Sequence, residues 1–259
     1  MEKQVECLSR GYTLRGVLHQ PEVSKGKVPM VVILHGFCDD RNEINFVHVE
    51  LARRLCSHGV ASVRFDFAGS GSSDGSFQDM TVSNEVADAQ AILNYVRSLD
   101  FVNAEKIALH GLSLGGCVAS IVAGLEGSAI RALSMWCPAP DVVYNMRNKM
   151  LCGVDVRDIE ENGYADFEGL RVGVEFYKDA LTLDPFAIAA QYPGPVNLVH
   201  GDADITASIN CSYRYKEIFG ERAELLVVHG AEHRFKSVEF REARMHSAET
   251  FLTRHLLGR

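Results

Sequence analysis

The residues best suited to chemistry in this chain are a serine, an aspartate and a histidine, each following an apolar, strand-like run. Ser113 stands between Gly111 and Gly115 in the pattern G-x-S-x-G, directly after the apolar stretch 106–110. A serine at a sharp strand-to-helix turn needs glycines two positions away, because Cβ atoms there would collide. The pattern therefore predicts an exposed nucleophilic hydroxyl and the chemistry of acyl transfer.

A serine hydroxyl is a weak nucleophile, so this chemistry requires a base and a group that orients the base. After Ser113, one apolar run ends in Gly-Asp-Ala-Asp and a later one ends in His-Gly-Ala-Glu-His. We predict Asp204 rather than Asp202 as the acid, because it lies further into its loop, where its side chain can turn back. We predict His233 rather than His229 as the base, because His229 still belongs to the end of its strand.

The developing negative charge of such a reaction needs backbone donors, and a further strand-like run supplies candidates. The stretch 30–34 ends in His-Gly-Phe. We expect the backbone N–H groups of Phe37 and Leu114, the residue after the serine, to form the oxyanion hole. Cys38 follows Phe37; we expect it to be a buried filler, and a place in the lining of the site is the alternative.

Strand-like and helix-like segments alternate along most of the chain, with short connections. This order is typical of a mainly parallel sheet with helices on both faces, in which the ends of strands meet at one edge. At 259 residues with 47% hydrophobic content, residues 1–259 are expected to form a single domain. The expected strands are 5–9, 14–19, 31–34, 61–67, 106–110, 130–136, 196–200 and 225–228, and the expected helices are 46–58, 83–99, 115–125, 208–219 and 238–257.

The segment 138–193 interrupts the alternation and follows the sixth strand. It is rich in methionine, phenylalanine and tyrosine and carries many charges. An insertion at the strand ends can cover a reactive serine and exclude water, so we predict a cap or lid. An excursion of short helices with no part in binding is the alternative.

Taken together, the motifs resemble those of serine hydrolases of the α/β-hydrolase fold, and more narrowly those of the small bacterial feruloyl (cinnamoyl) esterases. The resemblance covers almost the whole chain and is weakest in the segment 138–193. It implies an eight-stranded, mainly parallel sheet with a small cap insertion, Ser113 as nucleophile, Asp204 as acid, His233 as base, and Phe37 and Leu114 as oxyanion donors. The motifs that carry it are HGF at 35–37, RFDFAGSGSSDG at 64–75, GLSLGG at 111–116, HGDAD at 200–204 and GAEHRF at 230–235.

The resemblance also suggests a substrate contact within the insertion. Tyr177 lies in the stretch Val-Gly-Val-Glu-Phe-Tyr-Lys, which resembles the part of the family's insertion whose tyrosine meets the phenolic end of the substrate. A tyrosine offers both an apolar ring and a hydroxyl to a hydroxycinnamoyl group. The implied substrate is a small ester with an aromatic acyl group.

Composition restricts the remaining classes of function. The formal net charge of −8 argues against binding to nucleic acid. The sequence shows no membrane-spanning run, no signal-peptide pattern, no phosphate loop and no spacing typical of metal ligands. Its seven cysteines include no C-x-x-C pair, so reduced thiols in a cytoplasmic protein are expected. No cofactor or metal is expected, and whether the chain forms a homodimer is left open.

Two kinds of alternative function remain at this point. The same triad would serve a general carboxylesterase, a monoacylglycerol lipase or an acyl-peptidase, because only the cap and the pocket select the substrate. A catalytically silent binding module is the alternative from another class, and the presence of all three triad residues argues against it.

Overall fold

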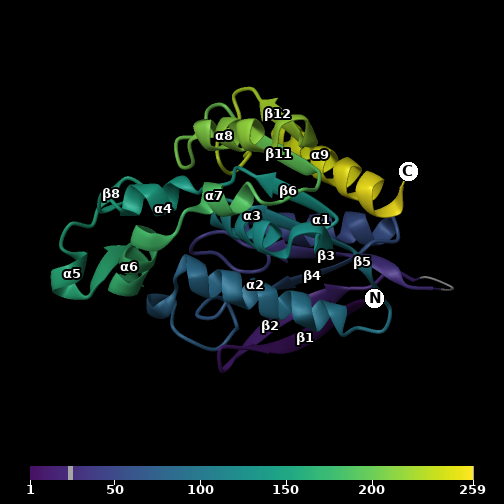
Figure 1. Cartoon of the computed structure of the whole chain (residues 1–259), viewed down its shortest axis with the longest axis horizontal. Helices are drawn as coiled ribbons and strands as arrows, with labels where there is room; N and C mark the ends of the chain where they lie inside the picture. The colour runs from purple at the N-terminus through teal and green to yellow at the C-terminus, as the bar shows by residue number, and fades with distance from the viewer. Residues whose placement is uncertain (23–25, 259) are drawn as a thin grey trace.

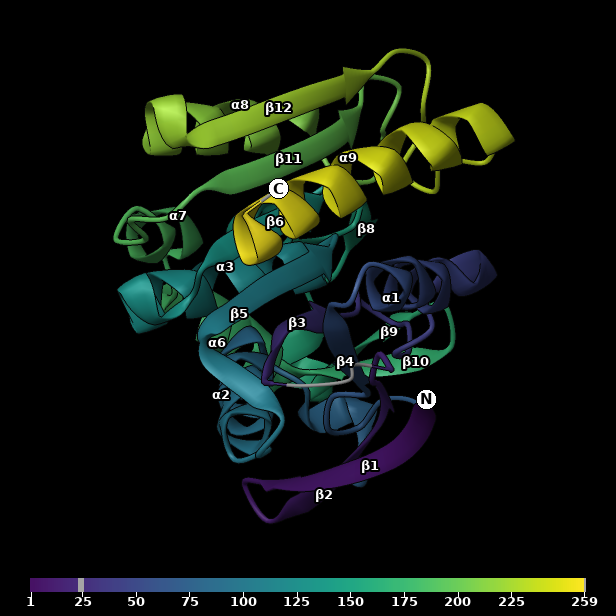
Figure 2. The ribbon, with the colours of Figure 1, turned by 90° about the vertical axis from the view of Figure 1, so that its right-hand side faces the viewer.

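An eight-stranded sheet forms the centre of the computed structural model, which describes residues 1–22 and 26–258. The strand order is β1-β2-β4-β3-β5-β6-β11-β12. Figure 2 shows β1 and β12 at the two opposite edges of the twisted sheet. The first three strands of this order pair antiparallel and the others pair parallel. The strands are β1 (Glu2–Ser9), β2 (Tyr12–His19), β3 (Val28–Leu34), β4 (Ala61–Phe65), β5 (Val102–Leu112), β6 (Ala132–Trp136), β11 (Val196–Gly201) and β12 (Ala223–Val228).

Helices cover both faces of this sheet (Figure 1). The first and last of the long helices share one hydrophobic core with β3 and β6, and the other three pack into a second core on the opposite face. β3 is buried along its whole length, as expected of a strand that is covered on both sides. The long helices are α1 (Val47–Ser57), α2 (Val82–Arg97), α3 (Leu114–Glu126), α8 (Ile209–Phe219) and α9 (Val238–Leu257).

The predicted fold class is confirmed, and each predicted strand and long helix is present at nearly the predicted bounds. The largest difference is β5, which begins at Val102 and extends to Leu112 rather than covering only 106–110. Residues 103–106 are exposed or half-buried, so the apolar pattern marks the buried part of the strand that follows them. Because β3, β5, β6, β11 and β12 run parallel, the loops that follow them gather at one edge of the sheet.

The turn from β5 into α3 is sharp and strained at Ser113. This serine has φ 55° and ψ −121°, a region that residues with a Cβ adopt rarely and at a cost. A Cβ on Gly111 would overlap the carbonyl of Gly115, and one on Gly115 would overlap the carbonyls of Leu34 and His35. The two glycines therefore allow α3 to begin directly against the end of β3, as the sequence predicts.

The segment between β6 and β11 forms a separate set of short elements, and Figure 1 shows α4, α5 and α6 extending away from one end of the sheet. Its last helix, α7, packs on α3, where a Cβ on Gly124 would overlap the Ile188 carbonyl. The insertion is thus anchored on the core at its end. Its elements are α4 (Asp141–Met146), β7 (Met150–Leu151), β8 (Val154–Asp155), α5 (Ile159–Asn162), β9 (Tyr164–Phe167), β10 (Leu170–Gly173), α6 (Val174–Thr182) and α7 (Pro185–Ala189).

Among the described residues, the structure holds no helix with the length and apolar character needed to cross a membrane.

The close approach of α3 to β3 yields a first prediction. Gly115→Ala should lower the free energy of unfolding by about 1–3 kcal/mol, because the added methyl group must push α3 away from two backbone carbonyls. Leu125→Ala on the same helix is the control: Leu125 is 52% exposed, and its loss should change stability by less than about 0.5 kcal/mol. Urea unfolding of both variants measures this. Equal stabilities for Gly115→Ala and the wild type would show that the turn has room for a methyl group at position 115.

Candidate active site

Backbone hydrogen bonds hold the Ser113 turn from both sides. Its N–H donates to the carbonyl of Trp136 at the end of β6 at 2.9 Å, and its carbonyl accepts from the N–H of Ala139 at 3.0 Å. The serine is therefore fixed to the first residues of the insertion as well as to β6. Its side chain faces a cavity of about 310 Å³ that His233 also lines.

The predicted acid and base lie together. His233 Nδ1 is 2.6 Å from Asp204 Oδ2, and the Asp204 side chain is fully buried while that of His233 is 14% exposed. The second oxygen of Asp204 accepts from the N–H groups of Thr206 at 2.8 Å and Ala207 at 2.9 Å. A carboxylate accepts hydrogen bonds, so Nδ1 carries the proton and Nε2 is left as the basic nitrogen of a neutral imidazole. The arrangement is that of an oriented general base.

A second histidine supports Asp204 from behind. His200 is fully buried, and its Nε2 lies 3.2 Å from Asp204 Oδ2 and 3.1 Å from the carbonyl of Ala207. Its Nδ1 accepts from the Ser212 hydroxyl at 2.7 Å. Burial alone would raise the pKa of Asp204, but the hydrogen bonds from His200 and His233 outweigh burial and hold that pKa well below its usual range. Asp204 is therefore charged at neutral pH.

The two residues that the sequence left as rivals pair with each other elsewhere. His229 Nδ1 is 2.7 Å from Asp202 Oδ2, and Asp202 also accepts from the N–H of Gly230 at 2.6 Å. The His229 side chain is 87% exposed, and neither residue lines the cavity beside Ser113. The geometry thus separates a buried pair beside the serine from an exposed pair at the surface.

Part of the cavity wall is apolar. Val142 and Phe167 from the insertion line it, together with Phe37. The Phe37 ring lies 5.4 Å from the ring of Phe167, 5.6 Å from that of Phe77 and 6.0 Å from that of Phe176. These contacts fix the side chain of the residue whose N–H is the expected oxyanion donor. The insertion therefore contributes directly to the surface that a substrate would meet.

A buried acid holds the loop of the expected oxyanion hole. Glu43 Oε1 accepts from the N–H of Gly36 at 2.5 Å. In the described part of the chain, no hydrogen bond occupies the N–H of Phe37, and Leu114 begins α3, where amides lack an acceptor four residues back. Burial, followed by the nearby charge of Asp39, raises the pKa of Glu43 to about 8. Glu43 is thus largely uncharged at neutral pH.

The two remaining candidates differ in their relation to the cavity. Cys38 lines it, and burial keeps its thiol protonated by raising its pKa. Tyr177 on α6 does not belong to the cavity lining within the described chain. Its ring packs against the core, and the ammonium group of Lys149 lies 5.4 Å from its centre. The structure thus brings Phe167, and not Tyr177, to the wall of the cavity.

Sequence reasoning missed three polar residues at this site: Glu43, His200 and Arg244. Only Arg244 carries a sequence signal, because on α9 it shares the apolar stripe of Phe240, Ala248 and Phe251. His200 lies four residues before Asp204 and Glu43 seven residues after Gly36, but neither spacing by itself indicates a role at the site.

The acid also belongs to a group with the spacing of metal ligands, which the sequence did not show. Three potential metal-ligand atoms, one each from the side chains of Cys137, His200 and Asp204, lie within 4.8 Å of one another. Burial raises the pKa of the Cys137 thiol well above its usual value, and both nitrogens of His200 take part in hydrogen bonds. A thiol and a committed imidazole are poor ligands, so these groups serve the hydrogen bonding of Asp204.

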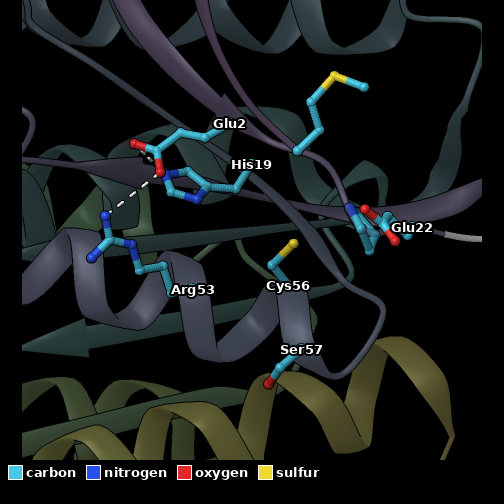
Figure 3. A pocket seen from close by; sticks show the side chains of 8 residues that line it. Glu2, His19, Glu22, Arg53, Cys56 and Ser57 are labelled. Carbon is cyan, nitrogen blue, oxygen red and sulfur yellow. Dashed lines mark ion pairs between the residues drawn. The ribbon is translucent and has the colours of Figure 1, made fainter.

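A second hollow, of about 320 Å³, lies between the N-terminal strands and α1 and shares no residue with the cavity beside Ser113 (Figure 3). Its charged groups compensate one another: Glu2 lies 3.6 Å from Arg53 and 3.9 Å from His19. Burial lowers the pKa of His19 to about 4 and raises that of Cys56. The hollow therefore presents a neutral imidazole and an unreactive thiol, with no activated nucleophile.

A strained serine between a parallel strand and a helix, on a sheet covered by helices on both faces, defines the class of the α/β-hydrolases. The chain is an α/β-hydrolase, and esterases are among its structural neighbours. The structure of Est1E from Butyrivibrio proteoclasticus with ferulic acid bound superposes with a TM-score of 0.90 and 26% identity, over 98% of this chain and 99% of that chain. Alpha/beta hydrolase domain-containing protein 10 from mouse, at a TM-score of 0.76 and 22% identity over 97% of this chain and 99% of that chain, shares the fold.

The model of the Prolyl oligopeptidase family, peptidase family S9, matches residues 47–259, and the chain belongs to this family. Mouse mitochondrial palmitoyl-protein thioesterase ABHD10 is 30% identical over 192 residues, which are 70% of this chain and 60% of that protein. An uncharacterised 31.7 kDa protein of Escherichia coli is 30% identical over 90 residues, 35% of this chain and 30% of that protein. The matches thus span between about a third and three fifths of these relatives' lengths.

The buried acid yields a prediction about stability and pH. The folded-state pKa of Asp204 lies below the unfolded value of about 3.9, so its carboxylate stabilises the fold above that pH and loses this effect as the pH falls. Asp204→Asn should therefore be less stable than the wild type at neutral pH, with a deficit that shrinks on acidification. Urea unfolding at about pH 7 and about pH 3 measures this difference.

Asp202→Asn is the matched control, since it removes a carboxylate from a histidine pair that lies in solvent. Its stability should follow that of the wild type at both pH values. A deficit for Asp204→Asn that is constant with pH would contradict the assigned electrostatic role and indicate a loss of packing alone.

Proposed function

We propose that this protein is a serine carboxylic-ester hydrolase that works through an acyl-enzyme intermediate. The observation that carries the proposal is the 2.6 Å contact of His233 with the buried, charged Asp204, beside a strained serine on the same cavity. This combination supplies an oriented base for a nucleophile, which is what a serine hydroxyl lacks on its own.

In the first half of the reaction, Ser113 Oγ attacks the ester carbonyl while His233 Nε2 takes the hydroxyl proton. The tetrahedral oxyanion accepts hydrogen bonds from the N–H groups of Phe37 and Leu114. Asp204 stabilises the imidazolium through Nδ1–H. Collapse of the intermediate breaks the bond to the leaving oxygen, which receives the proton from His233, and the alcohol departs.

In the second half, a water molecule gives its proton to His233 and attacks the acyl-enzyme at the same carbonyl. The second oxyanion collapses, and Ser113 Oγ leaves with the proton from His233. The carboxylic acid is released and the free serine is restored. No metal or cofactor takes part in either half.

For the acyl group we propose a hydroxycinnamoyl moiety such as feruloyl or p-coumaroyl. The support is the apolar wall built by Phe37, Val142 and Phe167 and the similarity to Est1E, whose structure holds ferulic acid. Flat aromatic rings pack well on such phenylalanine surfaces. The insertion 138–193 acts as the cap in this proposal, because it supplies Val142 and Phe167.

Two further activities have specific support. The similarity to mouse palmitoyl-protein thioesterase ABHD10 favours a thioester as substrate, and membership of the Prolyl oligopeptidase family favours a peptide-like amide. Both would use the same nucleophile and base. A substrate panel with an aromatic ester, an aliphatic ester, an acyl thioester and an acyl-peptide amide separates these activities from the ester hydrolase.

The first test is Ser113→Ala. This variant should keep the fold and lose roughly 10⁴ to 10⁶-fold in turnover of methyl ferulate and p-nitrophenyl butyrate, because the attacking oxygen is gone. A fluorophosphonate probe should label the wild type at Ser113 and leave the variant unlabelled. Ser57→Ala, an exposed serine on α1, is the control and should keep wild-type rates. Near-normal hydrolysis by Ser113→Ala would show that Ser113 is not the nucleophile.

The second test concerns the acyl group. Phe167→Ala should reduce the ratio of kcat/KM for methyl ferulate to that for p-nitrophenyl butyrate about tenfold, the effect of losing ~1.4 kcal/mol of aromatic contact. Leu170→Ala, on the neighbouring strand and outside the cavity lining, should leave the ratio unchanged. Tyr177→Phe run alongside decides whether the tyrosine hydroxyl reaches the substrate. A preference of the wild type for aliphatic esters would contradict the hydroxycinnamoyl acyl group but would still support an ester hydrolase.

A further inference from the structure

Arg244 is a buried cation at the active-site cavity. It lies on α9 with 1% of its surface exposed, and it is among the residues that line the cavity with Ser113 and His233. Its guanidinium carbon is 4.9 Å from the centre of the Trp136 ring and 4.7 Å from that of Phe235. Two aromatic rings therefore hold the guanidinium in place, and cation–π attraction offsets part of the cost of burying it.

The hydrogen-bonding capacity of this guanidinium is not used. Within residues 1–22 and 26–258, neither Nε nor Nη1 of Arg244 has a hydrogen-bond partner, and no carboxylate lies within ion-pair distance. Burial lowers the pKa of Arg244 to about 10, so the group is charged at neutral pH. A buried charge without an acceptor is costly, since its donors have left water without replacement. An anion in the cavity would compensate this charge and offer an acceptor to the guanidinium.

Among the described residues, the nearby acids Glu43 and Glu232 attract this charge, but neither forms an ion pair with it. Glu43 is buried and largely uncharged at neutral pH, and one of its oxygens already accepts from the N–H of Gly36. Asp39 and Glu168 also line the cavity but are more exposed, so water and salt screen them. Arg234 adds a second guanidinium at the exposed rim. The deepest charge in the cavity is therefore positive.

The position of the cation along the chain indicates which part of an ester it would meet. In the proposed reaction His233 hands its proton to the leaving oxygen, so the alcohol portion lies on the His233 side. Arg234 and Phe235 directly follow His233, and Phe235 contacts Arg244. Arg244 thus packs against the segment that carries His233, whereas the apolar side chains of Val142 and Phe167 belong to the insertion.

We propose that Arg244 is a specificity-determining residue that binds a carboxylate on the alcohol portion of the substrate, so that the preferred esters are those of hydroxy acids. This inference rests on the proposed ester hydrolase and adds the class of alcohol to it. A carboxylate suits the site because a guanidinium forms paired, charge-assisted hydrogen bonds with its two oxygens. Ser113 and Arg244 line one cavity of about 310 Å³, so the carboxylate lies close to the ester oxygen.

The test compares two esters that differ in one charge: the feruloyl ester of glycolic acid and the feruloyl ester of glycolamide. They have nearly the same size, and only the first carries a carboxylate. The wild type should favour the glycolate ester in kcat/KM by on the order of tenfold or more. Arg244→Met should lower the ratio of the two values by at least that factor. Comparing the ratio between proteins cancels the intrinsic reactivities of the esters and any loss of active protein.

Arg241→Met is the matched control, because Arg241 lies on the same helix and pairs with Glu50 outside the cavity lining. Its ratio should equal that of the wild type. Equal kcat/KM values of the wild type for the glycolamide and glycolate esters would overturn the proposal. An unchanged ratio of these values in a folded Arg244→Met protein would overturn it too.

A binding measurement separates this inference from the proposed function. N-feruloylglycine and N-feruloylglycinamide are amide analogues with and without the carboxylate, and calorimetry on Ser113→Ala measures their affinities without turnover. Affinity on the order of tenfold higher for the carboxylate, lost when Arg244→Met is added, would support the anion site even if neither ester were hydrolysed. Equal affinities would overturn it even if both esters were good substrates.

Discussion

The close approach of the start of α3 to the end of β3 is the constraint on which the site depends. Two glycines make it possible, since a Cβ on Gly111 or Gly115 would overlap backbone carbonyls. Between them, Ser113 is held at φ 55°, and hydrogen bonds to Trp136 and Ala139 fix it in that conformation. The turn brings the serine, the first amides of α3 and the loop after β3 to one place. The strain is maintained because the surrounding sheet and helix leave the turn no other path.

The parallel sheet then brings the remaining groups to the serine. Asp204 follows β11 and His233 follows β12, and these neighbouring strands end at the same edge. Within that edge, burial separates the two aspartate–histidine pairs. Asp204 has lost its water and has gained His200 and two backbone amides as donors, while Asp202 and His229 remain in solvent. Only the first pair has the fixed geometry that a general base requires.

The walls of the cavity show how one fold can be specialised through its loops. The insertion supplies apolar side chains, and the Phe37 ring packs against Phe77, Phe167 and Phe176 and so joins the loop after β3 to the insertion. The cavity lining also includes a buried guanidinium and a carboxyl group that burial keeps largely uncharged. In the proposed ester hydrolase the same catalytic groups would serve many acyl compounds, so the residues that line the cavity decide which compound is bound.

The sequence by itself determined the architecture and the catalytic candidates. Alternating apolar runs specified the eight strands and five long helices, because burial on both faces of a parallel sheet leaves a strong local pattern. The G-x-S-x-G turn could be read because Gly111 contacts Gly115 within the motif, although the carbonyls that leave no room for a Cβ on Gly115 belong to Leu34 and His35, far away in the sequence.

The tertiary structure alone decided which polar groups meet. Glu43, His200 and Arg244 come from three separate segments, and their roles depend on burial and on how these segments pack around the serine. For Tyr177 the sequence around the residue suggested a substrate contact. In the structure its ring packs against the core and does not belong to the cavity lining. Local pattern records which face of an element is buried, whereas the contents of a cavity depend on how several elements pack around it.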